Sequence, residues 1–144
     1  MTPSSIFQLC STIALVGWVI LIFMPFWLNS DKFIIGIIVT LFCIVYTWLV
    51  VSNFHFPDFK KFNSLDGVMQ LFTQPPIVVA GWVHYLAFDL MTGIFIKRNA
   101  LKFGISHWLL VPCLFFTFML GPIGLLLYLL IRFIVTKQYF ADNY

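Results

Sequence analysis

The sequence predicts an all-α integral membrane protein, a bundle of four transmembrane helices with a short interfacial amphipathic helix before the third span. Hydrophobic residues make up 62% of the 144 positions, and the mean hydropathy of +1.02 lies far outside the range of soluble domains. Only eight basic and five acidic side chains are present, and the basic ones lie near the ends of apolar runs. We expect a single domain over residues 1–144.

Composition also excludes several classes of function. The net charge is +3, but no basic stripe exists, so a nucleic-acid partner is not expected; weak attraction to anionic lipid headgroups is the simpler reading. The cysteines lie inside apolar runs without CxxC spacing, which argues against a zinc knuckle or a disulfide framework. They are Cys10, Cys43 and Cys113.

The first two apolar runs predict an antiparallel helical hairpin. The run from Ile6 to Leu28 carries no charge and ends with an interfacial Phe26-Trp27; at ~1.5 Å per residue it can cross the ~30 Å hydrocarbon layer. It lacks a cleavage site for a signal peptide, so we expect a retained span. After a short polar break, Phe33 to Ser52 returns as the second span, helical because the backbone must satisfy its own hydrogen bonds in lipid.

Residues 53–74 change character, because polar side chains alternate with phenylalanines. Within this segment Phe62, Leu65, Met69 and Phe72 recur at steps of three and four, which gives one apolar helical face. We therefore predict an amphipathic helix over 64–72, capped by Ser64 or Asn63 and lying in the membrane interface.

Two further spans complete the predicted bundle. Pro75-Pro76 opens the third, Ile77 to Ile96, and a short basic loop follows. The fourth is expected from His107 to about Val135, with a kink at Gly121-Pro122 because proline lacks an N–H and its ring clashes with the preceding turn. In this four-span order the basic residues divide equally between the two sides, so no topology is assigned.

The segment from Trp82 to Gly93 holds the densest polar cluster in a span. Asp89 is an ionisable group deep in the membrane, which makes it a candidate functional residue that should face the bundle. His84 lies near mid-membrane. At ~100° per residue the two diverge by about 140° around the helix, so they form no direct pair. The alternative for both is an interhelical hydrogen bond, for His84 to Tyr46, Thr47 or Thr117.

Gly121-Pro122 can open the backbone of the fourth span and form one wall of a cavity. Because the third and fourth spans are joined by a short loop, matching depths predicts that His84 faces 116–120, the approach to the kink. His84 and Asp89 are the candidate functional residues of this cavity. The predicted substrate-binding residues are Trp82, Tyr85, Phe88, Tyr46, Thr117 and Gly121.

No cofactor or metal is expected. Haem held by two histidines would need a second histidine at the depth of His84, but His55 and His107 fall near opposite membrane edges. Non-haem iron would need several carboxylate ligands on facing helices, whereas the chain has no Glu and one buried Asp.

Three ordered motifs carry a family resemblance. They are Trp82-x-His84-Tyr85-Leu86-Ala87-Phe88-Asp89-Leu90-x-x-Gly93, then Gly121-Pro122-x-Gly124-Leu125-Leu126-Leu127-Tyr128, and before both Leu65-x-Gly67-Val68-x-x-Leu71-Phe72. Together they resemble the abscisic-acid-deficient family of small membrane proteins. In plants that family sits in the plastid membrane and is required for making neoxanthin from violaxanthin, a carotenoid epoxide; bacterial members are described as a domain of unknown function.

The resemblance implies binding or conversion of a carotenoid or related isoprenoid lipid, by acid/base epoxide opening or isomerisation without a redox cofactor. Burial disfavours the charged form of both groups, so Asp89 is expected to be the neutral acid and His84 the neutral base. The alternative is a non-catalytic membrane partner or lipid-positioning scaffold. Expected partners are the bilayer, a long apolar isoprenoid, and a second copy or a membrane enzyme. The lack of a plant-type transit extension favours a bacterial inner membrane over a plastid membrane.

Overall fold

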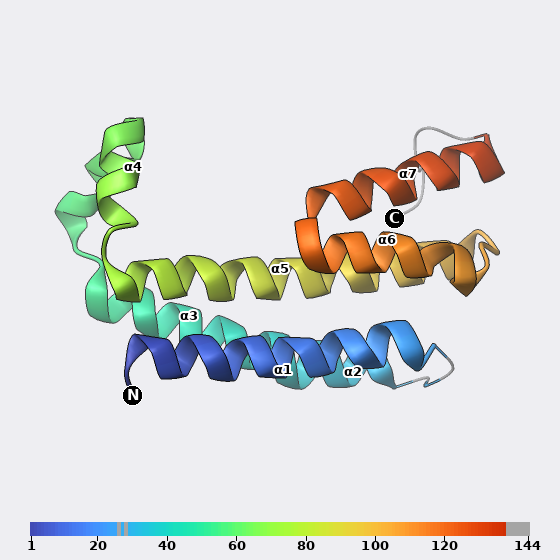
Figure 1. Cartoon of the computed structure of the whole chain (residues 1–144), viewed down its shortest axis with the longest axis horizontal. Coiled ribbons are helices and arrows are strands. Elements are labelled where there is room, and N and C mark those ends of the chain that lie inside the picture. The colour runs from blue at the N-terminus through green and yellow to red at the C-terminus, as the bar shows by residue number, and fades with distance from the viewer. Residues whose placement is uncertain (26, 28, 138–144) are drawn as a thin grey trace.

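The computed structural model describes residues 1–25, 27 and 29–137, and every regular element among them is helical. Three long helical rods lie side by side, and two shorter groups of helices rise from the same side of this layer at its opposite ends (Figure 1). The first rod is α1 (Pro3–Phe23) and the third is α5 (Pro75–Lys102). The second joins α2 (Ser30–Phe33), a π-helical turn η1 (Ile34–Val39) and α3 (Thr40–Asn53).

Small residues allow the rods to pack closely. A Cβ on Gly93 of α5 would lie 2.6 Å from Leu21 and 2.9 Å from Trp18 of α1. A Cβ on Gly17 of α1 would in turn lie 3.1 Å from Leu90 of α5. Without a hydrophobic driving force inside lipid, such close approach of backbones supplies the dispersion contacts that hold helices together.

An ion cluster joins the second rod to α5. Asp31 accepts from Lys97 Nζ at 3.0 Å and from Arg98 Nε at 2.8 Å, and Lys97 also donates to Ser30 Oγ at 2.7 Å. The second rod therefore begins at Ser30, three residues before the predicted start at Phe33. Of the residues predicted as a polar break, Asn29 precedes the helix, and Ser30, Asp31 and Lys32 belong to its first turn.

All-α architecture is confirmed, and the three rods are each long and apolar enough to cross a membrane. Within the described part of the chain no fourth helix meets both conditions, so the predicted count of four is not reached. The first span agrees with the prediction as far as Phe23; Phe26 and Leu28, predicted at its end, lie outside the described residues.

The predicted fourth span, one kinked helix from His107 to about Val135, is wrong. The structure has two helices there, α6 (His107–Leu120) and α7 (Pro122–Thr136), which double back at Gly121 (Figure 1). At ~1.5 Å per residue, 14 and 15 residues are too few to cross ~30 Å of hydrocarbon.

The reversal has three physical causes. Gly121 adopts φ +44° and ψ −92°, a backbone conformation that favours glycine. Gly124 lies against α6, where a Cβ would overlap the backbone of Thr117 and Cys113. Far along α7, Tyr128 Oη and Arg132 Nη1 both donate to Asn99 Oδ1 of α5, at 2.5 and 3.3 Å. These contacts return α7 to the end of the molecule from which α6 starts.

This reversal also changes the distribution of charge along the rods. Two basic residues lie at the end that carries α4 (Leu65–Leu71), namely Lys60 and Lys61. The other six lie at the opposite end, where α2 and α6 begin and α5 and α7 end. They are Lys32, Lys97, Arg98, Lys102, Arg132 and Lys137.

The segment before α5 forms a 3₁₀ helix η2 (Phe56–Asn63) followed by α4, which stands crosswise to the rods (Figure 1). Ser64 caps α4 by accepting from the Gly67 N–H at 3.1 Å, as predicted. In η2, Lys61 Nζ lies 2.8 Å from Asp58 and the His55 N–H donates to the same carboxylate. Both hydrogen bonds favour the charged form and hold the pKa of Asp58 below its usual range.

The predicted apolar face of this segment points outward. Leu65 and Met69 are 76% and 61% exposed, and Phe62 and Phe72 are about half exposed. Gly67 and Leu71 face the rest of the protein instead. A helix is thus present within the predicted range, while its amphipathic character and its membrane-surface position stay predictions.

Candidate functional site

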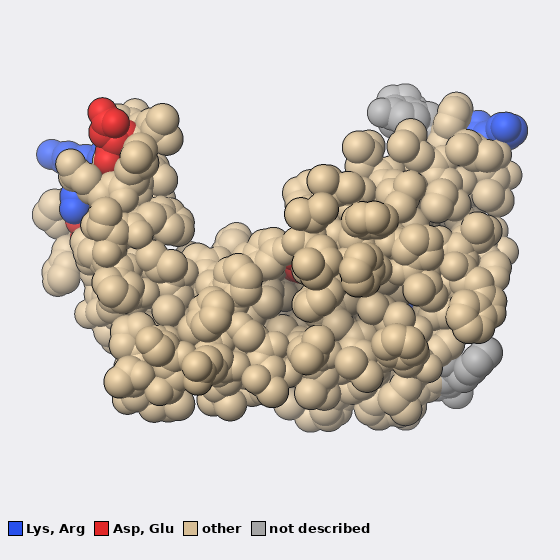
Figure 2. All heavy atoms as spheres, viewed as in Figure 1, with Lys and Arg blue, Asp and Glu red and all other residues tan. Residues whose placement is uncertain are grey.

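One side of α5 is left uncovered between the two raised ends of the molecule. Figure 2 shows this face hollowed between the end that carries α4 and the end that carries α6 and α7. Gly81, His84 and Phe88 follow each other at steps of three and four along α5, and Tyr85 precedes Phe88 by three residues, so all four lie on this side. Phe88 is 62% exposed and His84 is also exposed.

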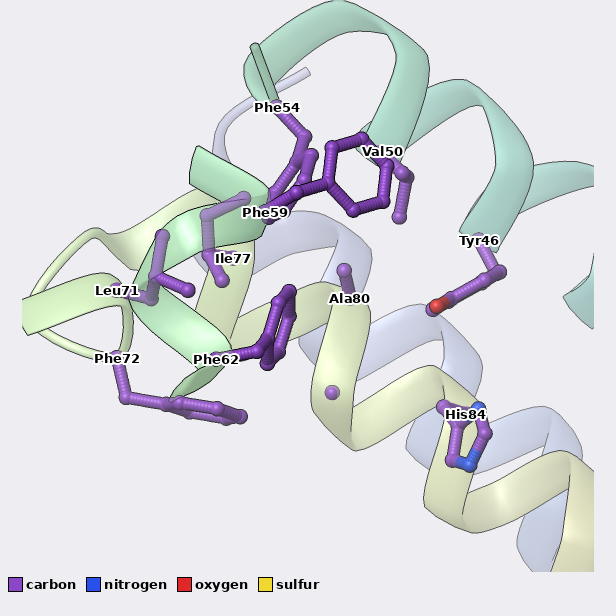
Figure 3. A pocket seen from close by; sticks show the side chains of 11 residues that line it. Tyr46, Val50, Phe54, Phe59, Phe62, Leu71, Phe72, Ile77, Ala80 and His84 are labelled. Atoms are coloured by element: carbon purple, nitrogen blue, oxygen red, sulfur yellow. The ribbon is translucent and has the colours of Figure 1, made fainter. Parts of the chain in front are cut away.

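At the α4 end lies an apolar pocket of about 380 Å³ (Figure 3). Phenylalanines of η2 and those that directly follow α3 and α4 surround it, and Ala80, Gly81 and His84 of α5 form its base. Phe72 extends over Gly81, where a Cβ would lie 2.9 Å from its ring. The pocket therefore depends on Gly81 having no side chain. Its aromatic lining is Tyr46, Phe54, Phe59, Phe62 and Phe72.

His84 lies at the inner end of this pocket, toward the middle of α5 (Figure 3). Its ring stacks on Phe88 at a centroid distance of 4.5 Å and lies 5.6 Å from the ring of Tyr46. The predicted residues His84, Phe88 and Tyr46 are thus brought together as an aromatic group. Since this group opens on the uncovered side of α5, a ligand in the pocket would contact the imidazole.

Asp89 lies at the edge of the uncovered side of α5, opposite the edge that carries His84, and is 9% exposed. Its Oδ2 is buried and makes no hydrogen bond, which is costly for a carboxyl group within lipid. A Cβ on Gly121 would come within 2.8 Å of Asp89 Oδ1, so the carboxyl abuts the α6–α7 turn. The protein thus supplies no hydrogen-bond partner to one oxygen of this carboxyl group.

Tyr85 connects Asp89 to the same turn. It precedes Asp89 by one helical turn, and its hydroxyl interacts with the carboxyl group. The hydroxyl also donates to the carbonyl oxygens of Phe118 and Met119, at 3.4 and 3.3 Å. Tyr85, Asp89 and Gly121 therefore form a polar group at the end of α6.

The expectation that His84 faces the approach to the kink is wrong, because Tyr85 and Asp89 occupy that face. Both side chains were expected to face the bundle. Asp89 is buried as expected, whereas His84 lies on an exposed side of α5. The predicted divergence of about 140° separates them, and the uncovered side of α5 lies between. His84 and Asp89 therefore lie at opposite edges of the uncovered side of α5 and do not contact each other.

The other two predicted binding residues have visible packing roles. Trp82 Nε1 donates to Ser11 Oγ at 2.9 Å and so ties α5 to α1. Thr117 is fully buried and donates to the Cys113 carbonyl oxygen within α6, at 2.8 Å. Thr117 also contacts Gly124 at the α6–α7 crossing. Neither side chain reaches the pocket at the α4 end.

Sequence reasoning missed the aromatic wall of the pocket. Phe54, Phe59 and Phe62 pack on one another, with ring centroids of Phe54 at 5.0 Å from Phe59 and 5.7 Å from Phe62. The steps of five and three between them are visible in the sequence, but of the three only Phe62 enters a prediction there, as part of the apolar face of the interfacial helix. Among the described residues, no three His, Cys, Asp or Glu side chains gather as a metal ligand set.

The chain matches the model of a known protein family. The family model described as ABA4-like, ABA DEFICIENT 4-like, matches residues 5–128, most of the chain. Those residues include the whole uncovered side of α5, the pocket and the α6–α7 turn. Neither a curated protein nor a solved structure matches the chain.

Proposed function

The chain belongs to the ABA DEFICIENT 4-like family, and on this premise we propose that it binds a long carotenoid-like isoprenoid in the bilayer and opens an epoxide on it. The observation that carries the proposal is the uncovered side of α5, which begins in an aromatic pocket at His84 and is flanked farther along by the buried Asp89. A rod-shaped apolar ligand lying along α5 would contact both.

The pocket suits the end group of such a ligand. Its volume of about 380 Å³ falls in the range of ligand pockets, roughly 300–1,000 Å³. The lining is almost wholly apolar, with Tyr46 and His84 as its polar members. Because the pocket opens along α5, the remainder of a polyene could extend toward the α6–α7 turn.

The chemistry requires one acid and one base, and the two act on different atoms. Asp89 in its protonated form donates its proton to the epoxide oxygen, and the C–O bond breaks. His84 takes a proton from a polyene carbon, and its electron pair forms the new double bond. The product is an unsaturated alcohol isomeric with the substrate, so no oxidant or reductant is needed. A ligand lying between the two side chains explains why they need not touch.

The second candidate is a non-catalytic membrane partner that positions an isoprenoid for another enzyme. The separation of His84 and Asp89 on opposite flanks of α5 favours it, because a single reacting centre usually brings its groups within hydrogen-bond reach. Both candidates share the binding site and differ only in turnover.

The two are distinguished by purifying the protein in detergent from a carotenoid-producing host and incubating it with a carotenoid 5,6-epoxide. Co-purified pigment together with an isomeric allenic alcohol supports the enzyme. Bound pigment that stays unchanged supports the positioning partner. Absence of both binding and conversion would contradict the proposed function.

We further propose that α1, the α2–α3 rod and α5 cross the membrane, while α6 and α7 enter and leave it on one side. The six basic residues then lie on the cytoplasmic side, because cytoplasmic loops carry the excess of Lys and Arg. In a chain without native cysteines, a membrane-impermeant thiol reagent should label Asn63→Cys in intact cells. Gly104→Cys should react only after the membrane is opened, and equal labelling of both from outside would overturn this topology.

A further inference from the structure

The uncovered side of α5 forms a trough from Ile77 to Asp89 that is closed at both ends. Resting on the proposed function, we propose that this trough binds only one half of a forty-carbon carotenoid, the half with the reacting end group. The other half lies outside the trough, among lipid chains. An isoprenoid epoxide of half that length is then a complete ligand and a complete substrate.

The segment before α5 closes the outer end of the trough. Leu71, buried in the last turn of α4, and Ile77, in the first turn of α5, line the pocket at the end away from His84 (Figure 3). Helix α4 stands crosswise to the rods at this point (Figure 1). A ligand in the pocket therefore cannot extend along α5 beyond Ile77.

Helices α6 and α7 close the inner end. Asp89 abuts Gly121 at the α6–α7 turn. Farther along the same side of α5, Phe95 packs against Tyr128 of α7, with ring centroids 6.4 Å apart. Asn99, one turn later, is buried and accepts from the Tyr128 hydroxyl. The side of α5 that is uncovered at the pocket is thus covered beyond Asp89.

The length between these two ends matches half of a forty-carbon carotenoid. The helix rises ~18 Å over the twelve residues from Ile77 to Asp89. An extended carbon chain advances ~1.2 Å per bond, since the three backbone bonds of an extended residue span ~3.6 Å. A carotenoid with two rings has ~25 bonds along its longest path, which gives ~30 Å for the molecule and ~15 Å for one half. One half fits in the trough, and the whole molecule does not.

The second half can leave the trough sideways into lipid. No helix lies over the middle of the trough, where His84 and Phe88 are exposed. Because lipid tails are as apolar as a polyene, the half outside loses nothing by lying among them. The protein therefore recognises one end group and the chain next to it, and the far ring contributes nothing to specificity.

Competition between two ligands tests the proposal on the purified full chain in lipid nanodiscs. The probes are a forty-carbon carotenoid 5,6-epoxide and a twenty-carbon apocarotenoid with the same epoxide end group, with both concentrations expressed relative to lipid. Absorbance of the displaced long pigment measures the exchange. The two affinities should agree within about threefold, because both ligands make the same contacts with the trough. Both ligands should also be converted.

A fatty ester on the ring serves as the matched control. On the far ring of the long carotenoid it should leave the affinity unchanged, because that ring lies in lipid. On the single ring of the short ligand it should weaken binding at least about tenfold, because that ring must enter a pocket of about 380 Å³. Gly81→Leu should lose both lengths of ligand, whereas Gly36→Leu should keep both.

Three outcomes would overturn the half-length site and leave the proposed function standing. They are binding of the short ligand at least about tenfold weaker than that of the long one, loss of binding when the far ring is esterified, and a Gly81→Leu protein that loses only the short ligand. If neither length bound to wild type, the proposed function and this inference would both be wrong.

Discussion

Asp89→Asn should lower the turnover of a carotenoid 5,6-epoxide by at least about 100-fold, the lower end of what a positioned general acid or base contributes. Asparagine keeps the size of the side chain beside Gly121 and Tyr85, but it has no acidic proton to give to the epoxide oxygen. The ligand should still be retained, because the pocket lined by the phenylalanines is untouched. Chromatography of bound and converted pigment measures both quantities in one sample.

Asp66→Asn is the matched control, because Asp66 lies exposed in the first turn of α4. This variant should convert substrate at the wild-type rate. His84→Gln should also lower turnover while leaving folded protein. Undiminished turnover in Asp89→Asn would exclude proton transfer by Asp89. Turnover lost together with thermal stability would instead make Asp89 a structural tie to the α6–α7 turn.

Gly124→Leu should give the largest loss of stability in the chain, at least about 3 kcal/mol, above the usual range for overpacking. The new side chain would have to displace the backbone of Thr117 and Cys113, and backbone atoms within a helix cannot rotate away as a side chain can. The α6–α7 pair should separate and expose Asn99, which accepts hydrogen bonds from Tyr128 and Arg132. Thermal unfolding of the purified protein in detergent measures the loss.

Gly36→Leu provides the comparison, because a Cβ at Gly36 meets no atom within 4 Å. Its unfolding temperature should stay close to that of wild type. If Gly124→Leu unfolded at the same temperature as Gly36→Leu, the close crossing of α6 and α7 would not support the fold.

The parts of the fold that depend on local pattern could be predicted from the sequence. Long apolar runs predict the three rods, because helix length and hydropathy decide whether a segment can cross lipid. The Ser64 cap was predictable for the same reason, since its hydrogen bond to Gly67 spans only three residues. In both cases the decisive interaction lies within the segment itself.

The reversal at Gly121 could not be predicted in this way. A glycine before a proline permits either a kinked helix or a reversal of the chain. The contacts that stabilise the reversal join residues that are distant in the sequence. Gly124 against Cys113 and Tyr128 with Asn99 depend on packing between helices. The predicted equal division of basic residues between the two membrane sides depended on the same error, because the reversal moves Arg132 and Lys137 to the other end of the molecule.

The sequence predicted which residues of α5 belong to the candidate site better than it predicted how they are arranged. Matching depths along two helices brought His84 opposite the approach to Gly121, but depth alone ignores rotation about the helix axis. Tyr85, the next residue, is turned by ~100° and makes the contact with α6 instead. The pocket needed the fold of η2 and α4 over α5, which the chain's apolar pattern does not specify.

The most direct test of the central claim, that an isoprenoid lies along α5 from the aromatic pocket, is pigment retention by Gly81→Leu beside Gly36→Leu. A leucine at 81 would occupy the space under Phe72 and fill the base of the pocket, whereas leucine at 36 enters open space. Absorbance of protein purified from a carotenoid-producing host should show pigment bound to wild type and Gly36→Leu and lost from Gly81→Leu. Equal pigment in all three would contradict binding at this site.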